Sequence, residues 1–192
     1  GDWNSLHIFT KILNESSQEH LKPLTVEFQS YYERIITDCV QQFMSRVSLE
    51  RSFQELLQCI QDLMHKTDSI FMGFNIFAEA SSLAVKTSFG RIGPAFIKDF
   101  AESVSLMNSN QSAYSLEVIE FCIRSMEFPN IFFFSYWKLL SERILFDGYF
   151  DAFVEKRLME ALQTHCPGDY WSKFSKMFND SESWNSTKII TS

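Results

Sequence analysis

The sequence has few of the residues that form tight turns, with 6 Gly and 4 Pro among 192 residues. Many-stranded β-sandwiches and β-barrels need turn-forming residues at most strand ends, so this shortage argues against them. A basic excess is also missing, because 17 Lys and Arg stand against 24 Asp and Glu, giving a formal net charge of −7. A nucleic-acid-binding protein needs clustered Lys and Arg to neutralise phosphates, and we therefore expect no nucleic-acid partner.

Long apolar runs without charge are absent as well. No run reaches the roughly 18 residues that a membrane-spanning helix needs, so we expect no membrane span. No signal peptide is visible at the start of the chain. The chain begins with Gly1-Asp2 rather than Met, which predicts a processed or excised piece, one part of a longer protein.

Motifs of catalysis and metal binding are missing. No H-E-x-x-H motif and no His pair at i,i+4 occurs, and the four histidines are scattered: His7, His20, His65 and His165. The turn between Gly90 and Gly93 lacks the lysine and the spacing of a phosphate-binding loop, and no nucleophile elbow is present. We therefore expect no catalytic residue, no cofactor and no bound metal, and we predict that the protein is not an enzyme.

No Cys-x-x-Cys pair is present. The four cysteines are widely spaced, at Cys39, Cys59, Cys122 and Cys166, and the first three fall within apolar periodic runs. This pattern favours free buried thiols in a reducing compartment, and so a cytoplasmic or nuclear location. The alternative is a secreted protein with two disulfides. Four glycosylation sequons would fit that alternative, at Asn14, Asn110, Asn179 and Asn185.

The sequence is rich in apolar and aromatic residues, which make up 45% and 16% of the chain and include 20 Phe. That composition excludes disorder over most of the chain, and the length suits one domain or a short array of repeats. Apolar residues recur at helical spacing, with no strand signal. The pattern predicts helices over 3–13, 24–46, 49–66, 68–87, 94–107, 112–127, 129–146, 149–165 and 169–178. Residues 179–192 are polar, and we predict a loop or a frayed end there.

Local signals place the helix ends. Pro94 and Pro129 are expected to open helices, and Thr67 or Asp68 is expected to cap the helix over 68–87. The segment 128–166 is expected to form a central helical hairpin whose aromatic residues are packing residues. In its second helix we expect the apolar residues to point inward: Phe150, Phe153, Val154, Leu158, Ala161 and Leu162.

Short connections make successive helices antiparallel neighbours, and the resulting hairpins recur about every 35–45 residues, as in HEAT and armadillo arrays. The predicted fold class is therefore all-α, with antiparallel helical hairpins stacked as a HEAT-like solenoid in a single helical-repeat domain over residues 1–178. A compact orthogonal helix bundle is the alternative.

Charged residues on the helices between 112 and 165 are the candidates for contact with a partner: Glu117, Glu120, Glu155, Lys156 and Arg157. The last three form a triplet that we expect on the outer face of the 149–165 helix, where a plain solvated face is the alternative. The glutamates are expected to line one concave side with Glu127 and Glu160, and an acidic concave surface would attract basic segments.

Three segments between Ser115 and Tyr170 carry a resemblance to a known family. They are Val118-Ile119-Glu120-Phe121-Cys122, then Phe134-Ser135-Tyr136-Trp137-Lys138-Leu139-Leu140, then a helix over 150–162 that closes before Cys166-Pro167. This pattern resembles HEAT repeats of importin-β-type karyopherins, most closely the transportin-SR and importin/exportin branch. The resemblance implies a nuclear transport receptor that holds a cargo protein or the small GTPase Ran on inner helices.

Such receptors have many more repeats than 192 residues can hold, so the resemblance implies a fragment or a shorter HEAT protein. No cargo or GTPase residues are carried over, because the matched positions are core positions. The leading hypothesis is a non-enzymatic protein-binding module, with basic cargo segments or a small GTPase as partner. The alternatives are a HEAT-like or bundle scaffold subunit of a nuclear or cytosolic complex, and the secreted protein with disulfides.

Overall fold

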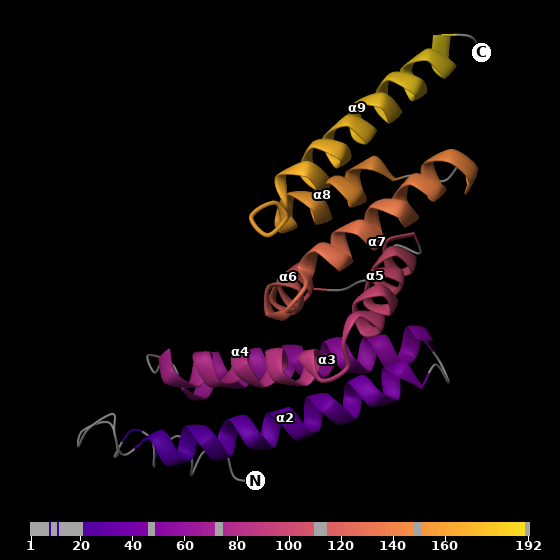
Figure 1. Cartoon of the computed structure of the whole chain (residues 1–192). Coiled ribbons are helices and arrows are strands. Elements are labelled where there is room, and N and C mark those ends of the chain that lie inside the picture. Colours follow the sequence, from indigo (N-terminus) through magenta and orange to yellow (C-terminus); the bar gives the residue numbers. More distant parts are fainter. Residues whose placement is uncertain are drawn as a thin grey trace. The chain divides into compact units, whose positions relative to one another are not determined.

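The computed structural model describes residues 8, 11, 21–45, 49–71, 75–109, 115–147 and 151–190. Within these ranges all regular structure is helical (Figure 1), which confirms the all-α prediction. The helices are α2 (Lys22–Met44), α3 (Leu49–Ile70), α4 (Asn75–Gly90), α5 (Pro94–Ser109), α6 (Leu116–Ser125), α7 (Pro129–Glu142), the π-helix η2 (Arg143–Asp147), α8 (Ala152–Leu162) and α9 (Gly168–Ile190). The predicted helix over 3–13 lies almost wholly outside the described residues.

The chain divides into two compact units, Gly1–Ile92 and Gly93–Ser192. The division falls at Gly93, whose φ of 78° is a left-handed conformation that glycine adopts with little strain. Pro94 follows and starts α5, as predicted. We predicted one helical-repeat domain over 1–178; the contacts instead group the residues into two units, and each is described by itself.

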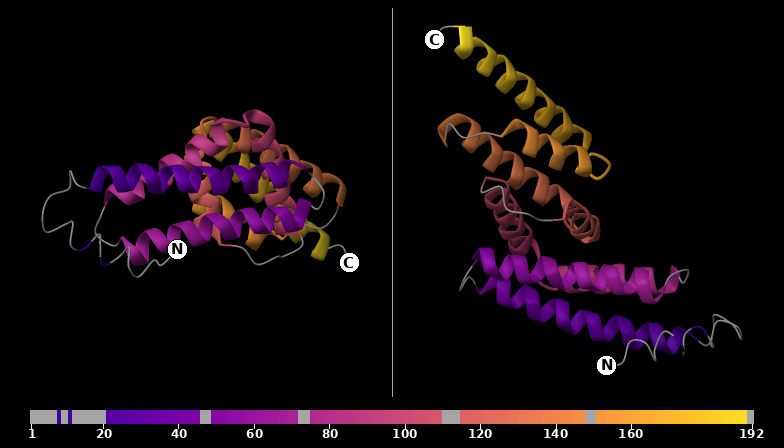
Figure 2. Two further views of the ribbon diagram at one scale, coloured as in Figure 1. Left: turned by 90° about the horizontal axis from the view of Figure 1, so that it is seen from below. Right: turned by 180° about the vertical axis from the view of Figure 1, so that it is seen from behind.

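In the first unit, α2 packs against both α4 and α3 (Figure 2). An aromatic cluster joins the three helices. The Phe28 ring of α2 lies 5.3 Å from the ring of Phe71, just beyond the end of α3, and 5.3 Å from that of Phe77 on α4. The Phe71 and Phe77 rings are stacked at 3.8 Å. All three side chains are buried, so the cluster forms part of the core of this unit.

The predicted cap at Thr67 or Asp68 is wrong. Helix α3 continues through both residues to Ile70, and the next helix starts only at Asn75. Thr67 is buried, and its hydroxyl donates to the carbonyl of Leu63 at 2.8 Å and lies 2.7 Å from the hydroxyl of Ser81 on α4. A threonine whose hydroxyl bonds within its own helix and to a neighbouring helix does not end that helix.

In the second unit, helices two apart in the sequence pack on one another. Helix α5 packs on α7, α7 on α9, and α6 on α8, with smaller contacts between the sequential pairs α6–α7 and α8–α9. A series of aromatic ring contacts connects α5, α7 and α9. Phe100 of α5 lies 6.1 Å from Phe132, Phe132 lies 5.7 Å from Tyr136 on α7, and Tyr136 lies 6.4 Å from Phe174 on α9.

Helix α7 packs into the core on one side only. Phe132, Phe133 and Tyr136 are fully buried, as the sequence predicted, whereas Phe134 is 51% exposed.

The prediction of a loop or frayed end over 179–192 is wrong as far as Ile190, because α9 runs from Gly168 to that residue. No Gly or Pro follows Gly168 to stop the helix, and elongation of a formed helix adds one hydrogen bond per residue without requiring an apolar face.

None of the helices in the described ranges is both long enough and apolar enough to cross a membrane.

Candidate functional site

The structure places the five predicted partner-binding residues on two helices that pack together, α6 and α8. Glu117, Lys156 and Arg157 are exposed. Glu120 is half-buried, and its carboxylate lies 3.0 Å from Nε2 of His165, just after α8. Glu155 is not on the outer face, where we predicted it, because it is buried with an exposed fraction of 2%.

The reason lies in the helical pattern of α8. Glu155 is spaced at i, i+3, i+4 and i+7 with three buried apolar residues, Leu158, Met159 and Leu162. Residues at that spacing share one face of a helix, and this face of α8 is the core face. The same spacing can be read from the sequence. The charged neighbours Lys156 and Arg157 nevertheless led to the prediction that Glu155 is exposed.

Glu155 is the centre of a buried polar network. One carboxylate oxygen lies 2.6 Å from Nη2 of Arg143, and the other accepts a 2.6 Å hydrogen bond from the Tyr136 hydroxyl. The side-chain amide of Asn108 donates to the Tyr136 oxygen at 2.9 Å, and Nη1 of Arg143 donates to the carbonyl of Ser105 at 3.1 Å. The network therefore connects α5, α7, η2 and α8.

Burial raises the pKa of the Glu155 carboxyl above its ordinary value. The nearby Arg143 guanidinium and the hydrogen bonds from Tyr136, Asn108 and Arg143 act in the opposite direction and are outweighed. A buried ion pair whose carboxylate also accepts a hydrogen bond holds helices in one arrangement. We interpret the network as a clamp that joins η2 to α8.

Among the residues that the structure describes, no group of three or more His, Cys, Asp or Glu side chains could hold a metal ion.

The π-helix η2 follows α7 directly and contains the clamp residue Arg143. Short π-helical turns are rare and frequently occur at functional sites. Two of its apolar side chains face solvent, with Leu145 72% and Phe146 80% exposed. Phe153, on the first turn of α8, is 70% exposed, and the Arg157 guanidinium lies 5.9 Å from its ring centroid. We call Leu145, Phe146 and Phe153 the hairpin tip, because they flank the α7–α8 connection.

The hairpin tip was not predicted from the sequence pattern. Phe153 was expected to point inward, which is wrong, and the run ending in Leu145-Phe146 was treated as packing. Helix α7 is apolar nearly all round, so its composition does not separate covered from uncovered positions.

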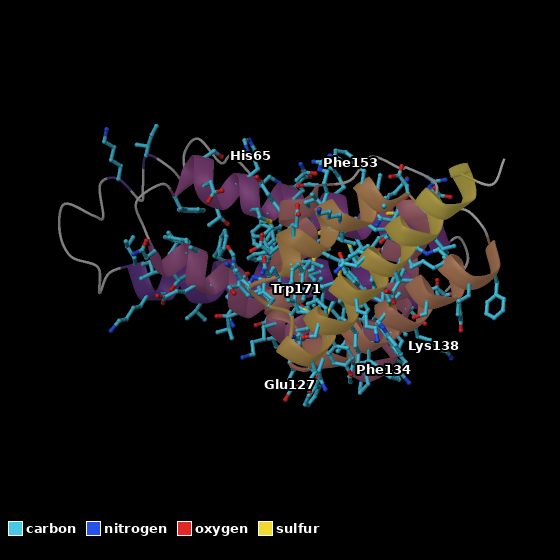
Figure 3. The ribbon with its side chains drawn as sticks, turned by 90° about the horizontal axis from the view of Figure 1, so that it is seen from above. His65, Glu127, Phe134, Lys138, Phe153 and Trp171 are labelled. Carbon is cyan, nitrogen blue, oxygen red and sulfur yellow. The ribbon has the colours of Figure 1, made fainter. Side chains whose placement is uncertain are left out.

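A second aromatic surface, exposed at Phe134 and half-buried at Trp137 and Tyr170, lies on α7 and α9. Phe134 lies 6.5 Å from Trp137, and the Lys173 ammonium lies over the rings of Trp137 and Tyr170 at 5.2 and 4.9 Å. Figure 3 shows Phe134 on the opposite side of this unit from Phe153. The Lys173 cation lies over the Trp137 face, as the Arg157 cation lies over the Phe153 ring of the hairpin tip, so both surfaces include a cation–aromatic contact.

No protein-family model, no curated protein and no solved structure matches the chain.

Proposed function

We propose that the chain is a non-enzymatic protein-binding module that holds a partner protein at the hairpin tip. The single observation that carries the proposal is the exposure of Leu145, Phe146 and Phe153, at 72%, 80% and 70%. Scattered single apolar residues are normal on a protein surface, but three large ones beside one connection are characteristic of an interaction site. Phenylalanine is also enriched at interfaces over the rest of the surface.

The clamp supports this proposal because it fixes the residues on both sides of the tip. Arg143 stands two residues before Leu145 and three before Phe146, and Glu155 stands two residues after Phe153. Their ion pair at 2.6 Å therefore holds the two flanks of the tip against one another. A preorganised surface loses less conformational entropy when a partner binds, which favours affinity.

The chemistry of the surroundings indicates an amphipathic partner segment. Lys156 and Arg157 are exposed on α8 beside Phe153, so a partner that covers the tip meets apolar side chains next to positive charge. A concave acidic surface is less favoured, because Glu155 is buried and Glu120 is engaged by His165. We therefore propose a partner segment with apolar anchors and acidic neighbours, rather than a basic segment.

The packing of the second unit supports a HEAT-like arrangement of the kind found in karyopherins. In an array of hairpins each helix packs on its counterpart in the next hairpin, two places along the chain. The contacts of α5 with α7, α7 with α9, and α6 with α8 follow this rule. An up-and-down bundle would instead make its largest contacts between sequential helices. On this proposal the protein acts in the nucleus or cytoplasm, in protein transport or as a scaffold.

A photo-crosslinking amino acid at position 146 tests the proposal, because it captures a partner only at the hairpin tip. The matched control carries the same amino acid at position 106, since Leu106 on α5 is 48% exposed and lies outside the tip. We expect an adduct at 146 and none at 106. The captured protein is then purified and titrated against wild-type protein, Phe146→Ser/Phe153→Ser and Leu106→Ser.

Loss of two anchors at an interface centre should weaken binding at least about tenfold, and Leu106→Ser should change it less than about twofold. Equal capture at 146 and 106, or equal affinity of the two variants, would contradict the proposal. A parallel titration with Ran separates transport receptor from scaffold. Binding of GTP-loaded but not GDP-loaded Ran favours the receptor, and a captured partner with no Ran binding favours the scaffold.

A further inference from the structure

The seam between α2 and α3 in the first unit brings two cysteines together. The helices are antiparallel, because Phe28 near the start of α2 meets Phe71 beyond the end of α3, while Phe43 near the end of α2 meets Phe53 near the start of α3. Along this register Cys39, one turn before Phe43, lies across the seam from the middle of α3.

The residue that Cys39 meets there is Cys59. The register of the two helices therefore places the two thiols across the seam from one another, and their interaction shifts the pKa of each. Both side chains are half-buried, so the pair lies at the edge of the seam and not in the centre of the core. Neither thiol is in a disulfide in this structure. The sequence offered no sign of this pairing, because the two residues are far apart along the chain.

We infer that Cys39 and Cys59 form an oxidation site, at which a peroxide converts the two thiols into a disulfide that links α2 to α3. Small oxidants reach half-buried thiols, and two cysteines that meet across a helix seam are the arrangement that a disulfide between helices requires. The inference is independent of the proposed function, because it concerns the other unit of the chain.

The two thiols have different parts in the reaction. A hydrogen bond from Cys59 lowers the pKa of the Cys39 thiol, outweighing burial and the negative charges of Asp38 and Glu55. The same hydrogen bond, together with burial, raises the pKa of Cys59. The thiolate is the nucleophilic form, so Cys39 attacks the oxidant and Cys59 resolves the product.

The reaction balances with hydrogen peroxide as the named oxidant. The Cys39 thiolate attacks one peroxide oxygen, the O–O bond breaks, and the Cys39 sulfur becomes a sulfenic acid with release of hydroxide. The Cys59 sulfur then attacks the sulfenic sulfur, the S–O bond breaks, and the thiol proton leaves with the oxygen as water. In total, two thiols and one hydrogen peroxide give one disulfide and two water molecules.

The test treats the purified full chain with dilute hydrogen peroxide, alkylates the remaining thiols under denaturing conditions and maps the peptides by mass spectrometry. We expect a Cys39–Cys59 disulfide that a thiol reductant removes, with Cys166 still alkylated. Cys166 is the matched control, because it is also half-buried but burial raises its pKa to about 11. Fully buried Cys122 is expected to stay reduced.

Two cysteine variants test the roles. Cys59→Ala removes the hydrogen-bond donor, and we expect Cys39 to react more slowly with iodoacetamide at neutral pH; Cys59→Ser keeps a donor and should restore most of the rate. The inference is overturned if peroxide leaves Cys39 reduced while Cys166 is oxidised. It is equally overturned if Cys39 stops at sulfenic or sulfinic acid in wild-type protein without the link.

Discussion

Glu155 occupies a position in α8 where the helical pattern calls for an apolar side chain, and it is tolerated there because Arg143 and Tyr136 satisfy it. Ion pairs of this kind add little net stability compared with an apolar replacement of both partners, but removing one partner leaves a buried charge. We therefore expect removal of Glu155 to destabilise the fold more than removal of a surface glutamate does.

We predict that Glu155→Ala lowers the free energy of unfolding by about 3–5 kcal/mol, because Arg143 then stays buried without its counter-ion. The double variant Glu155→Leu/Arg143→Met should recover most of this loss, since no charge is left buried. Denaturant unfolding followed by circular dichroism measures both effects.

The control for this prediction is Glu142→Ala, at the end of α7. Glu142 forms an exposed pair with Lys138 at 4.0 Å, and exposed pairs contribute at most about 1 kcal/mol. If Glu155→Ala costs no more than Glu142→Ala, the clamp is not a buried ion pair in solution.

The raised pKa of Glu155 also has a consequence for the pH dependence of stability. The unfolded carboxyl titrates near its ordinary pKa of 4.5, and burial raises the folded pKa above that value. Between the two pKa values the folded chain holds a proton that the unfolded chain has released. The free energy of unfolding therefore gains a contribution that is fully present below pH 4.5 and is lost as the pH rises through the folded pKa.

We predict that wild-type protein loses stability relative to Glu155→Gln as the pH rises from 4.5 toward neutrality. Unfolding of both proteins across this range measures the difference and cancels the contributions of other groups. A difference that changes in the opposite direction would mean that Arg143 dominates and lowers the pKa of this carboxyl.

For single residues, the sequence predicted burial correctly where the polarity of a side chain matches the helical face on which it lies. The buried Phe132, Phe133 and Tyr136 were predicted from their apolar character alone. The predictions for Glu155 and Thr67 were wrong, because polar side chains were assumed either to be exposed or to cap a helix. Whether a buried polar group is satisfied depends on partners distant in the sequence, such as Ser81 for Thr67.

Among the helices, α8 and α6 begin in different ways. The Asp151 carboxylate accepts hydrogen bonds from the backbone N–H groups of Phe153 and Val154, at 3.0 and 3.2 Å. Ser115 stands at the equivalent position before α6 but makes no side-chain hydrogen bond there. The cap at Asp151 therefore orients the turn of α8 that carries Phe153 of the hairpin tip.

We predict that Asp151→Ala lowers the free energy of unfolding by about 1 kcal/mol, and that Ser115→Ala has an effect close to zero. Thermal or denaturant unfolding of the two variants beside wild type makes the comparison. Equal effects would show that the Asp151 carboxylate does not cap α8 in solution.

Most helix positions were predictable from apolar periodicity, and the prolines at 94 and 129 marked the starts of α5 and α7 correctly. The π-helical turn was not predictable, because no residue preference distinguishes η2 from the α-helix before it. The predicted helix over 129–146 is accordingly α-helical only to Glu142. Leu145 and Phe146 are exposed within this π-helical turn, so the candidate site lies where the sequence pattern predicts the structure least well.

For the whole molecule, the shortage of Gly and Pro and the helical spacing were enough to predict an all-α chain. The division at Ile92 and Gly93 was not foreseen, since it depends on which helices pack together rather than on any one of them. The proposed likeness to karyopherin HEAT repeats concerns part of the second unit only, and its candidate surface lies there too.

The affinity of a purified partner for the hairpin-tip variant is the most direct test of whether the protein binds its partner at the hairpin tip. With the protein captured at position 146, isothermal titration compares wild type with Phe146→Ser/Phe153→Ser, and circular dichroism shows that the variant keeps its helical content. We expect at least about tenfold weaker binding by a folded variant, since interface anchors dominate affinity. Unchanged affinity of the folded variant would contradict binding at the hairpin tip.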